Sequence, residues 1–347
     1  MQKIITPLLF MLCVAFSCNS GTEPKTTDEK STTTYPHTGK IERLDPTFDD
    51  IVGADAAIEI LADSFDWCEG PLWLPTRQAL IFSDIPPNTI FMWKEGEGKS
   101  VFLKPAGYTG DDPRLGEQGS NGLMLDPQGR LVLCQHGDRR MAVMTASLDA
   151  PKPEFETLAD NYEGKRLNSP NDGVFHSSGA LYFTDPPYGL ENGVNDSLKE
   201  IPFQGVYRRA PDGTVTLLTD ELSRPNGIAF SPDEKILYVA NSDPGRAIWM
   251  AYDVLDDGSI ANGHVFADVT SLVPTAAGLP DGMKVDEKGN IFATGPGGVL
   301  VFRPDGKHLG TIMTGQATSN CAFGDDGSSL YMTADMFLMR IKLKTKG

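Results

Sequence analysis

Residues 226–241 read NGIAFSPDEKILYVAN, and this stretch recurs in altered form five more times along the chain. Each copy begins with a polar residue, continues as a short apolar strand, turns, and ends with a second apolar strand. Turns rich in Gly, Pro, Asp and Ser between two apolar runs are typical of β-hairpins. The other copies are EGPLWLPTRQALIFSD (69–84), NGLMLDPQGRLVLCQ (121–135), DGVFHSSGALYFTD (172–185), DGMKVDEKGNIFATG (281–295) and NCAFGDDGSSLYMTA (320–334).

The spacing of the copies predicts a propeller. The first apolar residues of the second strands lie 39 to 56 residues apart, at Leu80, Leu131, Leu181, Leu237, Ile291 and Leu330. Repeats of about 40–50 residues with room for four strands are typical of propeller blades. We therefore expect an all-β fold, a six-bladed β-propeller over residues 46–347. Because the sixth repeat lacks an outer strand, we expect the apolar run 57–62 to fill that place and close the ring.

A residue with a side-chain oxygen precedes the inner strand of every copy. These residues are Glu69, Asn121, Asp172, Asn226, Asp281 and Asn320. Inner strands line the central channel of a propeller, so equivalent positions face one another. In the third copy Asn171 directly precedes Asp172, and either side chain can face the axis. Each residue alone is an ordinary turn residue, but six in register favour a shared oxygen ring. Such oxygens suit a hard cation, so the sequence predicts a central site for calcium or another divalent metal.

Four motifs carry a resemblance to a known family. They are Glu69-Gly70-Pro71, Ser169-Pro170-Asn171-Asp172-Gly173, Arg224-Pro225-Asn226-Gly227 and Pro280-Asp281-Gly282-Met283. In this order and at this spacing they resemble the senescence marker protein and gluconolactonase family, over roughly residues 65–343. The segments 121–122, 134–140 and 164–168 resemble the bacterial gluconolactonase branch of that family.

The resemblance implies a metal-dependent hydrolase of sugar lactones such as gluconolactone. In that family the metal is held by the residues that match Glu69, Asn226 and Asp281. The match to Asn171 is a further ligand or a substrate contact. Some members carry an arginine as a sugar contact two positions before that asparagine, where this chain has Ser169.

Lactone hydrolysis needs a polarised carbonyl and an activated water, because a lactone is a cyclic ester. Asp281 is the expected catalytic general base, as the resemblance also implies. Substrate contacts are expected from residues near the channel mouth, namely Asn121, His136, Asn171, Asp172 and Tyr188. For His136 and Tyr188 a purely structural loop role is an equal alternative. Two other functions stay open: another ester or organophosphate hydrolase on the same fold, and a non-catalytic ligand-binding propeller.

The N-terminus resembles an export signal. Lys3 precedes a mostly apolar run at 4–16 that is too short for a comfortable membrane span. Ala15-Phe16-Ser17-Cys18 resembles the lipobox of bacterial lipoproteins, and a plain secretory leader is the alternative. We expect a lipoprotein-type signal peptide over 1–18 and a disordered tether over 19–45. The protein would then be periplasmic or on the cell surface, with membrane contact only through lipidated Cys18.

The net charge limits which ligands are expected, and the cysteine content limits which covalent cross-links are expected. The net charge of −17, from 30 Lys+Arg and 47 Asp+Glu, argues against nucleic acid, which needs a basic footprint. Cys68, Cys134 and Cys321 follow the leader without C-x-x-C spacing, so we expect three buried, unpaired thiols. A small-molecule lactone is the expected partner, and the sequence does not indicate an oligomeric state.

Overall fold

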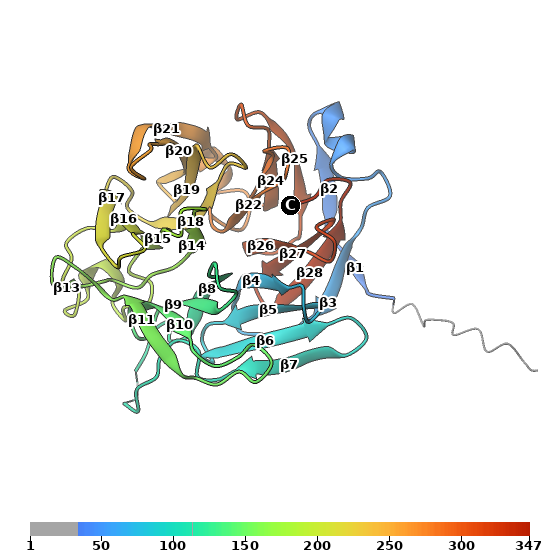
Figure 1. Ribbon diagram of the computed structural model, residues 1–347. Helices are drawn as coiled ribbons and strands as arrows, with labels where there is room; N and C mark the ends of the chain where they lie inside the picture. The colour runs from blue at the N-terminus through green and yellow to red at the C-terminus, as the bar shows by residue number, and fades with distance from the viewer. Residues whose placement is uncertain (1–33, 113) are drawn as a thin grey trace, which may run out of the picture. The chain divides into compact units, whose positions relative to one another are not determined.

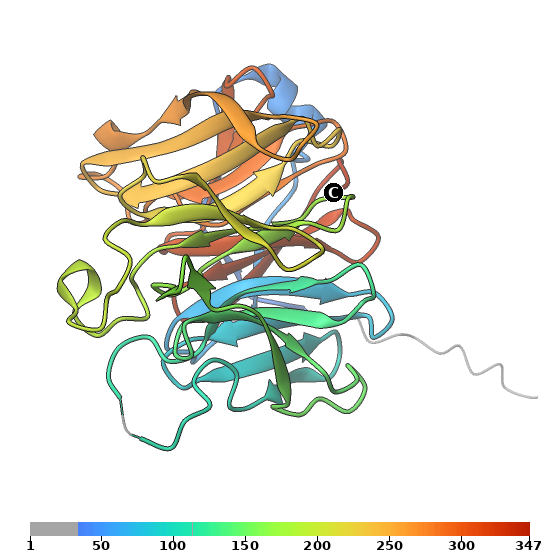
Figure 2. The same ribbon diagram turned by 60° about the vertical axis from the view of Figure 1, so that its left-hand side comes forward.

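The computed structural model describes residues 34–347 except Pro113. Within Tyr35–Gly347, six antiparallel sheets stand around a common axis as a six-bladed β-propeller, as predicted (Figure 1). The turned view shows the strands of neighbouring sheets stacked face to face (Figure 2). The predicted signal peptide 1–18, including Cys18, and residues 19–33 of the predicted tether lie outside the described residues. Among the residues that are described, no helix has the length and apolar character to cross a membrane.

Blades one to four are four-stranded meanders, each built from one sequence repeat and the two strands that follow it. Blade one contains β4 (Cys68–Leu74), β5 (Ala79–Asp84), β6 (Thr89–Lys94) and β7 (Gly98–Leu103). Blade two contains β8 (Ser120–Leu125), β9 (Leu131–Gln135), β10 (Arg140–Met144) and β11 (Phe155–Ala159). Blade three contains β14 (Gly173–Phe175), β15 (Leu181–Asp185), β16 (Gly205–Arg209) and β17 (Val215–Thr219). Blade four contains β18 (Pro225–Phe230), β19 (Ile236–Asp243), β20 (Arg246–Val254) and β21 (Ile260–Asp268).

Blades five and six each have five strands, because the N-terminal segment adds to both. Blade five contains β22 (Met283–Val285), β23 (Ile291–Gly295), β24 (Gly298–Phe302), β25 (His308–Met313) and β2 (Lys40–Arg43). Blade six contains β26 (Thr318–Gly324), β27 (Ser329–Ala334), β28 (Phe337–Lys342), β3 (Ile58–Ala62) and β1 (His37–Thr38). A small hairpin, β12 (Asn161–Tyr162) and β13 (Lys165–Arg166), and three 3₁₀ turns, η1 (Pro46–Asp50), η2 (Gly193–Asn195) and η3 (Thr270–Leu272), complete the described elements.

The ring closes through β3, which pairs antiparallel with β28, so the prediction for residues 57–62 is confirmed. The predicted tether boundary at residue 45 is wrong, because β1 and β2 already belong to the propeller. In β2 Ile41 lies opposite Ile312 of β25 and packs on the core between blades five and six. The sequence of these two strands is polar because they lie at sheet edges. An edge strand is held by backbone hydrogen bonds and one apolar contact, so its other side chains face water.

The apolar core lies between neighbouring blades. One cluster joins Phe292 and Val299 of blade five to Leu330 and Met332 of blade six, and each other cluster spans a similar boundary. The three cysteines lie in these layers, buried and unpaired, as predicted: Cys68, Cys134 and Cys321.

Buried hydroxyl groups in five of the six blades bond to the start of the inner strand of the next blade around the axis. Ser83 donates to the Asn121 carbonyl at 2.8 Å, and Thr184 donates to the Asn226 carbonyl at 2.8 Å. The same link recurs in blades four, five and six, from Ser242 to Pro280 O, from Thr294 to Ser319 O and from Ser319 to Cys68 O. Blades two and three are joined by the Gly122 N–H and the Asn171 carbonyl at 2.8 Å. The carbonyls that receive these bonds belong to residues at or beside the predicted polar ring, so the links hold that ring in place.

Candidate functional site

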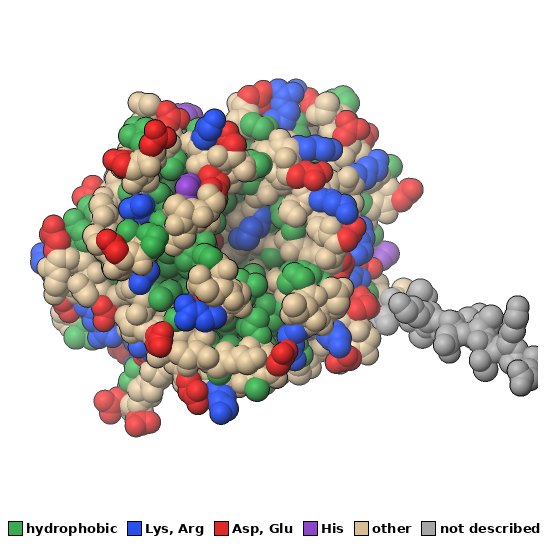
Figure 3. All heavy atoms as spheres, in the orientation of Figure 1, with side chains coloured by type: hydrophobic (Ala, Val, Ile, Leu, Met, Phe, Trp, Pro, Cys, Tyr) green, Lys and Arg blue, Asp and Glu red, His purple; other side chains and the backbone are tan. Residues whose placement is uncertain are grey.

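A cavity of about 510 Å³ lies where the inner strands meet. Figure 3 shows one face of the propeller, with charged side chains around its rim and apolar side chains together with Lys or Arg nearer the middle. Six of the eight predicted site residues line the cavity: Glu69, Asn121, Asn171, Tyr188, Asn226 and Asp281. The inner-strand starts of blades one to five therefore converge on one chamber.

Two predicted substrate contacts, Asp172 and His136, do not line the cavity. Asp172 is buried beside it, and its Oδ1 accepts the N–H of Gly173 at 2.8 Å. Burial raises the pKa of Asp172, while nearby Lys284 lowers it. In blade three the residue that faces the cavity is thus Asn171. His136 is fully buried behind Glu117, so it has no open surface to offer a ligand.

Backbone irregularities aim the polar side chains at the cavity. The pairing register shifts directly after Glu69 in β4, and again at the starts of β8, β18 and β26. Such β-bulges redirect a side chain and are frequent next to active sites. The following glycine is needed for close approach, because a Cβ on Gly70 would lie 2.1 Å from the Asn121 carbonyl oxygen. A Cβ on Gly227 would likewise lie 2.2 Å from the carbonyl oxygen of Asp281. The glycine that follows the polar residue in these repeats therefore allows neighbouring inner strands to approach closely around the axis.

Side chains at the ends of the second strands hold the loops that lead into the site. Asp84 Oδ1 accepts the backbone N–H of Trp67 at 2.9 Å. The carboxylate of Asp185 accepts the N–H groups of Asn168 and Ser169, each at 2.8 Å. In blade four Asn241 Oδ1 accepts the Arg224 N–H at 2.9 Å. Sequence reasoning missed these anchors, although their signal is visible as a terminal Asp or Asn in three of the six copies.

Four side-chain oxygens at the cavity lack hydrogen-bond partners among the described residues, and three of them belong to predicted site residues; the fourth is Glu117 Oε2. Asn121 Oδ1, Asn226 Oδ1 and Asp281 Oδ1 are buried and accept no hydrogen bond from any described residue. An unpaired buried polar atom costs free energy, so these atoms indicate a bound partner. A set of amide and carboxylate oxygens fits a hard divalent cation, and calcium tolerates such mixed sets. The residues present therefore fit the metal that the sequence predicts.

The electrostatics of the cavity favour a cation. Burial raises the pKa of Glu69 to about 8, the Gly70 N–H opposes that rise, and the charges of Asp172 and Glu117 add to it. Burial also raises the pKa of Asp281 well above its usual range, and the charge of Glu69 raises it further. A cation between such carboxylates would relieve their repulsion. The structure brings no three His, Cys, Asp or Glu side chains together as a metal site within 34–112 and 114–347, so the candidate set depends on amide oxygens.

Several cavity residues were not predicted. Glu117 enters from the connection between β7 and β8, and Arg224 stands exposed at the wall without an ion pair to any described residue. Trp67, Val273 and Leu279 contribute apolar surface. These residues lie in the connections, whose charged and bulky side chains do not repeat from blade to blade. The repeat pattern in the sequence therefore could not reveal them.

Ser169 does not line the cavity. Its buried Oγ donates to the Pro186 carbonyl at 2.6 Å and accepts the Gly189 N–H at 2.9 Å. The hydroxyl is thereby used to hold the loop that carries Tyr188. Recognition of a polar substrate must come from other residues of the cavity wall.

This chain is similar to known proteins in both sequence and fold. The family described as SMP-30/Gluconolactonase/LRE-like region matches residues 67–335. A gluconolactonase from Zymomonas mobilis subsp. mobilis is 39% identical over 350 residues, covering 99% of this chain and 96% of that protein. A solved gluconolactonase structure from Xanthomonas campestris is 32% identical, with a TM-score of 0.76, covering 90% of this chain and 98% of that one. Regucalcin from Agrobacterium tumefaciens, described as a calcium-binding protein, shares the fold at 22% identity and a TM-score of 0.63, covering 83% of this chain and 94% of that one.

Proposed function

Because this chain belongs to the SMP-30/gluconolactonase/LRE-like family, we propose that it is a metal-dependent lactonase that hydrolyses a sugar lactone. The observation that carries the proposal is the set of buried, unpartnered oxygens of Asn121, Asn226 and Asp281 around one cavity. Two relatives with the name gluconolactonase, at 39% and 32% identity, support the same reaction.

Glu69, Asn226 and Asp281 would hold the divalent cation, with Asn171 as a further oxygen donor. Calcium is the cation we propose, because the donors are all oxygens and a relative of this fold is described as calcium-binding. When bound, the cation polarises the lactone carbonyl as a Lewis acid.

Asp281 acts as the general base of the proposed reaction. A carboxylate has two oxygens, so Asp281 can offer one to the cation and use the other to take a proton from water. The water oxygen then bonds to the carbonyl carbon, the ring C–O bond breaks, and the ring oxygen takes up the proton that Asp281 accepted, which gives the hydroxy acid and restores the carboxylate. Burial raises the pKa of Tyr188, and the nearby charge of Asp281 raises it further. Tyr188 therefore keeps its proton and serves as a hydrogen-bond donor in the cavity.

A lactone panel with and without EDTA tests the function. We expect hydrolysis of gluconolactone that EDTA abolishes and added calcium restores. No hydrolysis of any lactone under any metal condition would refute the proposal and leave a ligand-binding propeller.

The apolar side of the cavity supports a second candidate on the same site. Trp67, Val273 and Leu279 give it a surface that a small polyol alone would not cover. A lactone or ester with an aryl or alkyl group would bury that surface. Including an aryl ester in the panel separates the candidates, because its kcat/KM would then exceed that of gluconolactone.

We also propose export and lipid anchoring, based on residues 1–18 of the sequence. Labelling with a lipid precursor should modify the wild-type protein and leave Cys18→Ser unmodified. Equal membrane retention of the two proteins would count against the anchor.

A further inference from the structure

Glu117 is a cavity residue that the proposed reaction does not use. It lies in the connection between β7 and β8, and its side chain is 38% exposed. Its Oε2 is nevertheless buried and accepts no hydrogen bond of good geometry from the described residues. Glu117, Asp281 and Tyr188 line the same cavity, and the charge of Glu117 contributes to the raised pKa of the other two.

His136 lies directly behind this carboxylate. Its side chain is fully buried, and Nδ1 lies 2.8 Å from Glu117 Oε2. Among the described residues, neither ring nitrogen has a hydrogen bond of good geometry. A buried imidazole without a polar partner is costly, and the close contact with Glu117 is the compensation that the structure shows. His136 therefore acts through Glu117 and not by touching a ligand.

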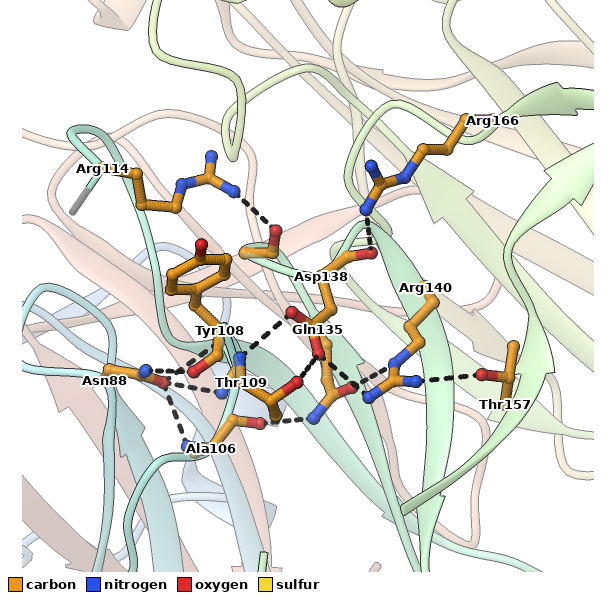
Figure 4. Close-up of polar contacts among 12 residues, drawn as sticks. Asn88, Ala106, Tyr108, Thr109, Arg114, Gln135, Asp138, Arg140, Thr157 and Arg166 are labelled. Atoms are coloured by element: carbon orange, nitrogen blue, oxygen red, sulfur yellow. Dashed lines mark hydrogen bonds and ion pairs between the residues drawn. The ribbon is translucent and has the colours of Figure 1, made fainter. Parts of the chain in front are cut away.

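Arg114 fixes the segment that carries Glu117. Its guanidinium donates to the carbonyls of Gly137, at 2.5 Å, and of Gly189. Gly137 follows His136 in the chain and Gly189 follows Tyr188, so one side chain ties three loops that border the cavity. Figure 4 shows Arg114 reaching toward one of these carbonyls.

The start of the same segment is anchored independently. Asp138 accepts the N–H of Thr109 at 3.0 Å and its hydroxyl at 2.6 Å, and Arg140 donates to the same carboxylate at 2.9 Å (Figure 4). Asn88 Oδ1 accepts the Gly107 N–H at 2.7 Å. The Gly119 N–H also donates to the Ile85 carbonyl at 2.9 Å, so the connection is anchored on both sides of Glu117.

The chemistry of the cavity limits what Glu117 can bind. The carboxylate of Glu117 disfavours an anionic group beside it, although the cationic side chain of Arg224 also stands on the cavity wall. A carboxylate accepts strong hydrogen bonds from neutral hydroxyl donors. The hydroxyl of Ser169, in contrast, is used within its own loop. We propose that Glu117 is a specificity-determining residue that binds substrate hydroxyls, with His136 as its positioning residue. This inference rests on the proposed lactonase function and assigns to Glu117 the recognition of the hydroxyl groups of the sugar lactone.

Calorimetric titration with 1,5-anhydroglucitol tests the inference without turnover. This ring carries the hydroxyls of gluconolactone but has a CH₂ group in place of the carbonyl. Glu117→Gln keeps the side-chain size and removes the charge, so its dissociation constant should rise about tenfold or more. Asp111→Asn is the matched control, because it removes one exposed charge from the same segment outside the cavity. An equal constant for the wild type and Glu117→Gln, or equal rises in both variants, overturns the proposal.

A double-variant cycle tests the role of His136. If His136 acts through Glu117, adding His136→Gln to Glu117→Gln should raise the constant no further. Additive effects would show that His136 is merely structural and overturn that role. Because His136 is buried, thermal unfolding is checked first. If His136→Gln does not fold, Arg114→Gln, which frees the Glu117 segment, takes its place in the cycle.

Two further measurements separate this inference from the proposed function. A wild-type protein that binds the polyol but hydrolyses no lactone refutes the lactonase and leaves Glu117 as the hydroxyl site. A wild-type protein that binds no polyol overturns the role of Glu117. Calcium affinity of Glu117→Gln should fall far less than that of Glu69→Gln, because Glu117 acts on the cation only through its charge. A loss as large as that of Glu69→Gln would make Glu117 a metal ligand and overturn the proposal.

Discussion

The side-chain amide of Asn226 donates to the hydroxyl of Ser242 at 2.9 Å, and its oxygen stays without a partner at the cavity. The same hydroxyl donates to the Pro280 carbonyl in blade five. One serine thus orients a proposed metal ligand and joins two blades.

Ser242→Ala should therefore weaken both the site and the fold. The free energy of unfolding should fall by about 1–3 kcal/mol, because buried partners lose a hydrogen bond. Calcium affinity should also fall, because the Asn226 amide is free to turn. Calorimetry and denaturant unfolding measure the two effects. Ser223→Ala, an exposed hydroxyl that bonds Asp243 in the same blade, is the control and should change neither. Unchanged calcium affinity in Ser242→Ala would contradict the orienting role.

Asp281→Asn separates the base from the ligand. It keeps an oxygen for the cation but removes the basic carboxylate, so kcat should fall at least about 10²-fold. Calcium affinity should weaken less, because Glu69 and Asn226 remain. Glu69→Gln should lose calcium affinity first, with activity partly restored by excess calcium. Steady-state kinetics across a calcium series compares the variants. Equal rescue of both would mean that Asp281 is a ligand and not the base.

Removal of residues 1–44 should destabilise the propeller relative to a reference protein that lacks only residues 1–33. The longer deletion removes β1, β2 and the packed Ile41. The melting temperature should drop by several degrees, at about 2–4 °C for each kcal/mol lost. Differential scanning calorimetry measures the difference. Identical melting temperatures would show that the two strands contribute nothing to stability.

His308 should make stability depend on pH. Burial lowers its pKa below 6.5, although the Gly310 carbonyl and the charge of Glu42 raise it. The unfolded chain then takes up a proton at a higher pH than the folded chain. The stability contribution is complete above about pH 6.5 and is lost as pH falls below it.

His308→Gln should therefore flatten the fall in melting temperature between about pH 7.5 and pH 5. His264→Gln, an exposed histidine on blade four, is the control and should keep the wild-type slope. The same slope in His308→Gln as in the wild type would exclude His308 as the cause.

The sequence predicted much of the architecture because its signals are local. A hairpin is encoded within about fifteen residues by alternation and turn chemistry, so all six repeats were visible, as was the room for further strands between them. The closing strand was visible because residues 57–62 are apolar. Residues 37–43 were missed because an edge strand with one apolar contact reads like a polar linker.

For the candidate site as well, one part was predicted from the sequence and another part was decided only by the structure. By itself, the sequence determined that a polar residue starts every inner strand, and its resemblance to a known family singled out Glu69, Asn226 and Asp281. The tertiary structure alone decided that Asn171 and not Asp172 faces the cavity, that His136 stands behind Glu117, and that Glu117 belongs to the site at all. Which way a side chain points depends on bulges and on contacts between blades some fifty residues apart, and no periodic pattern within one repeat carries that information.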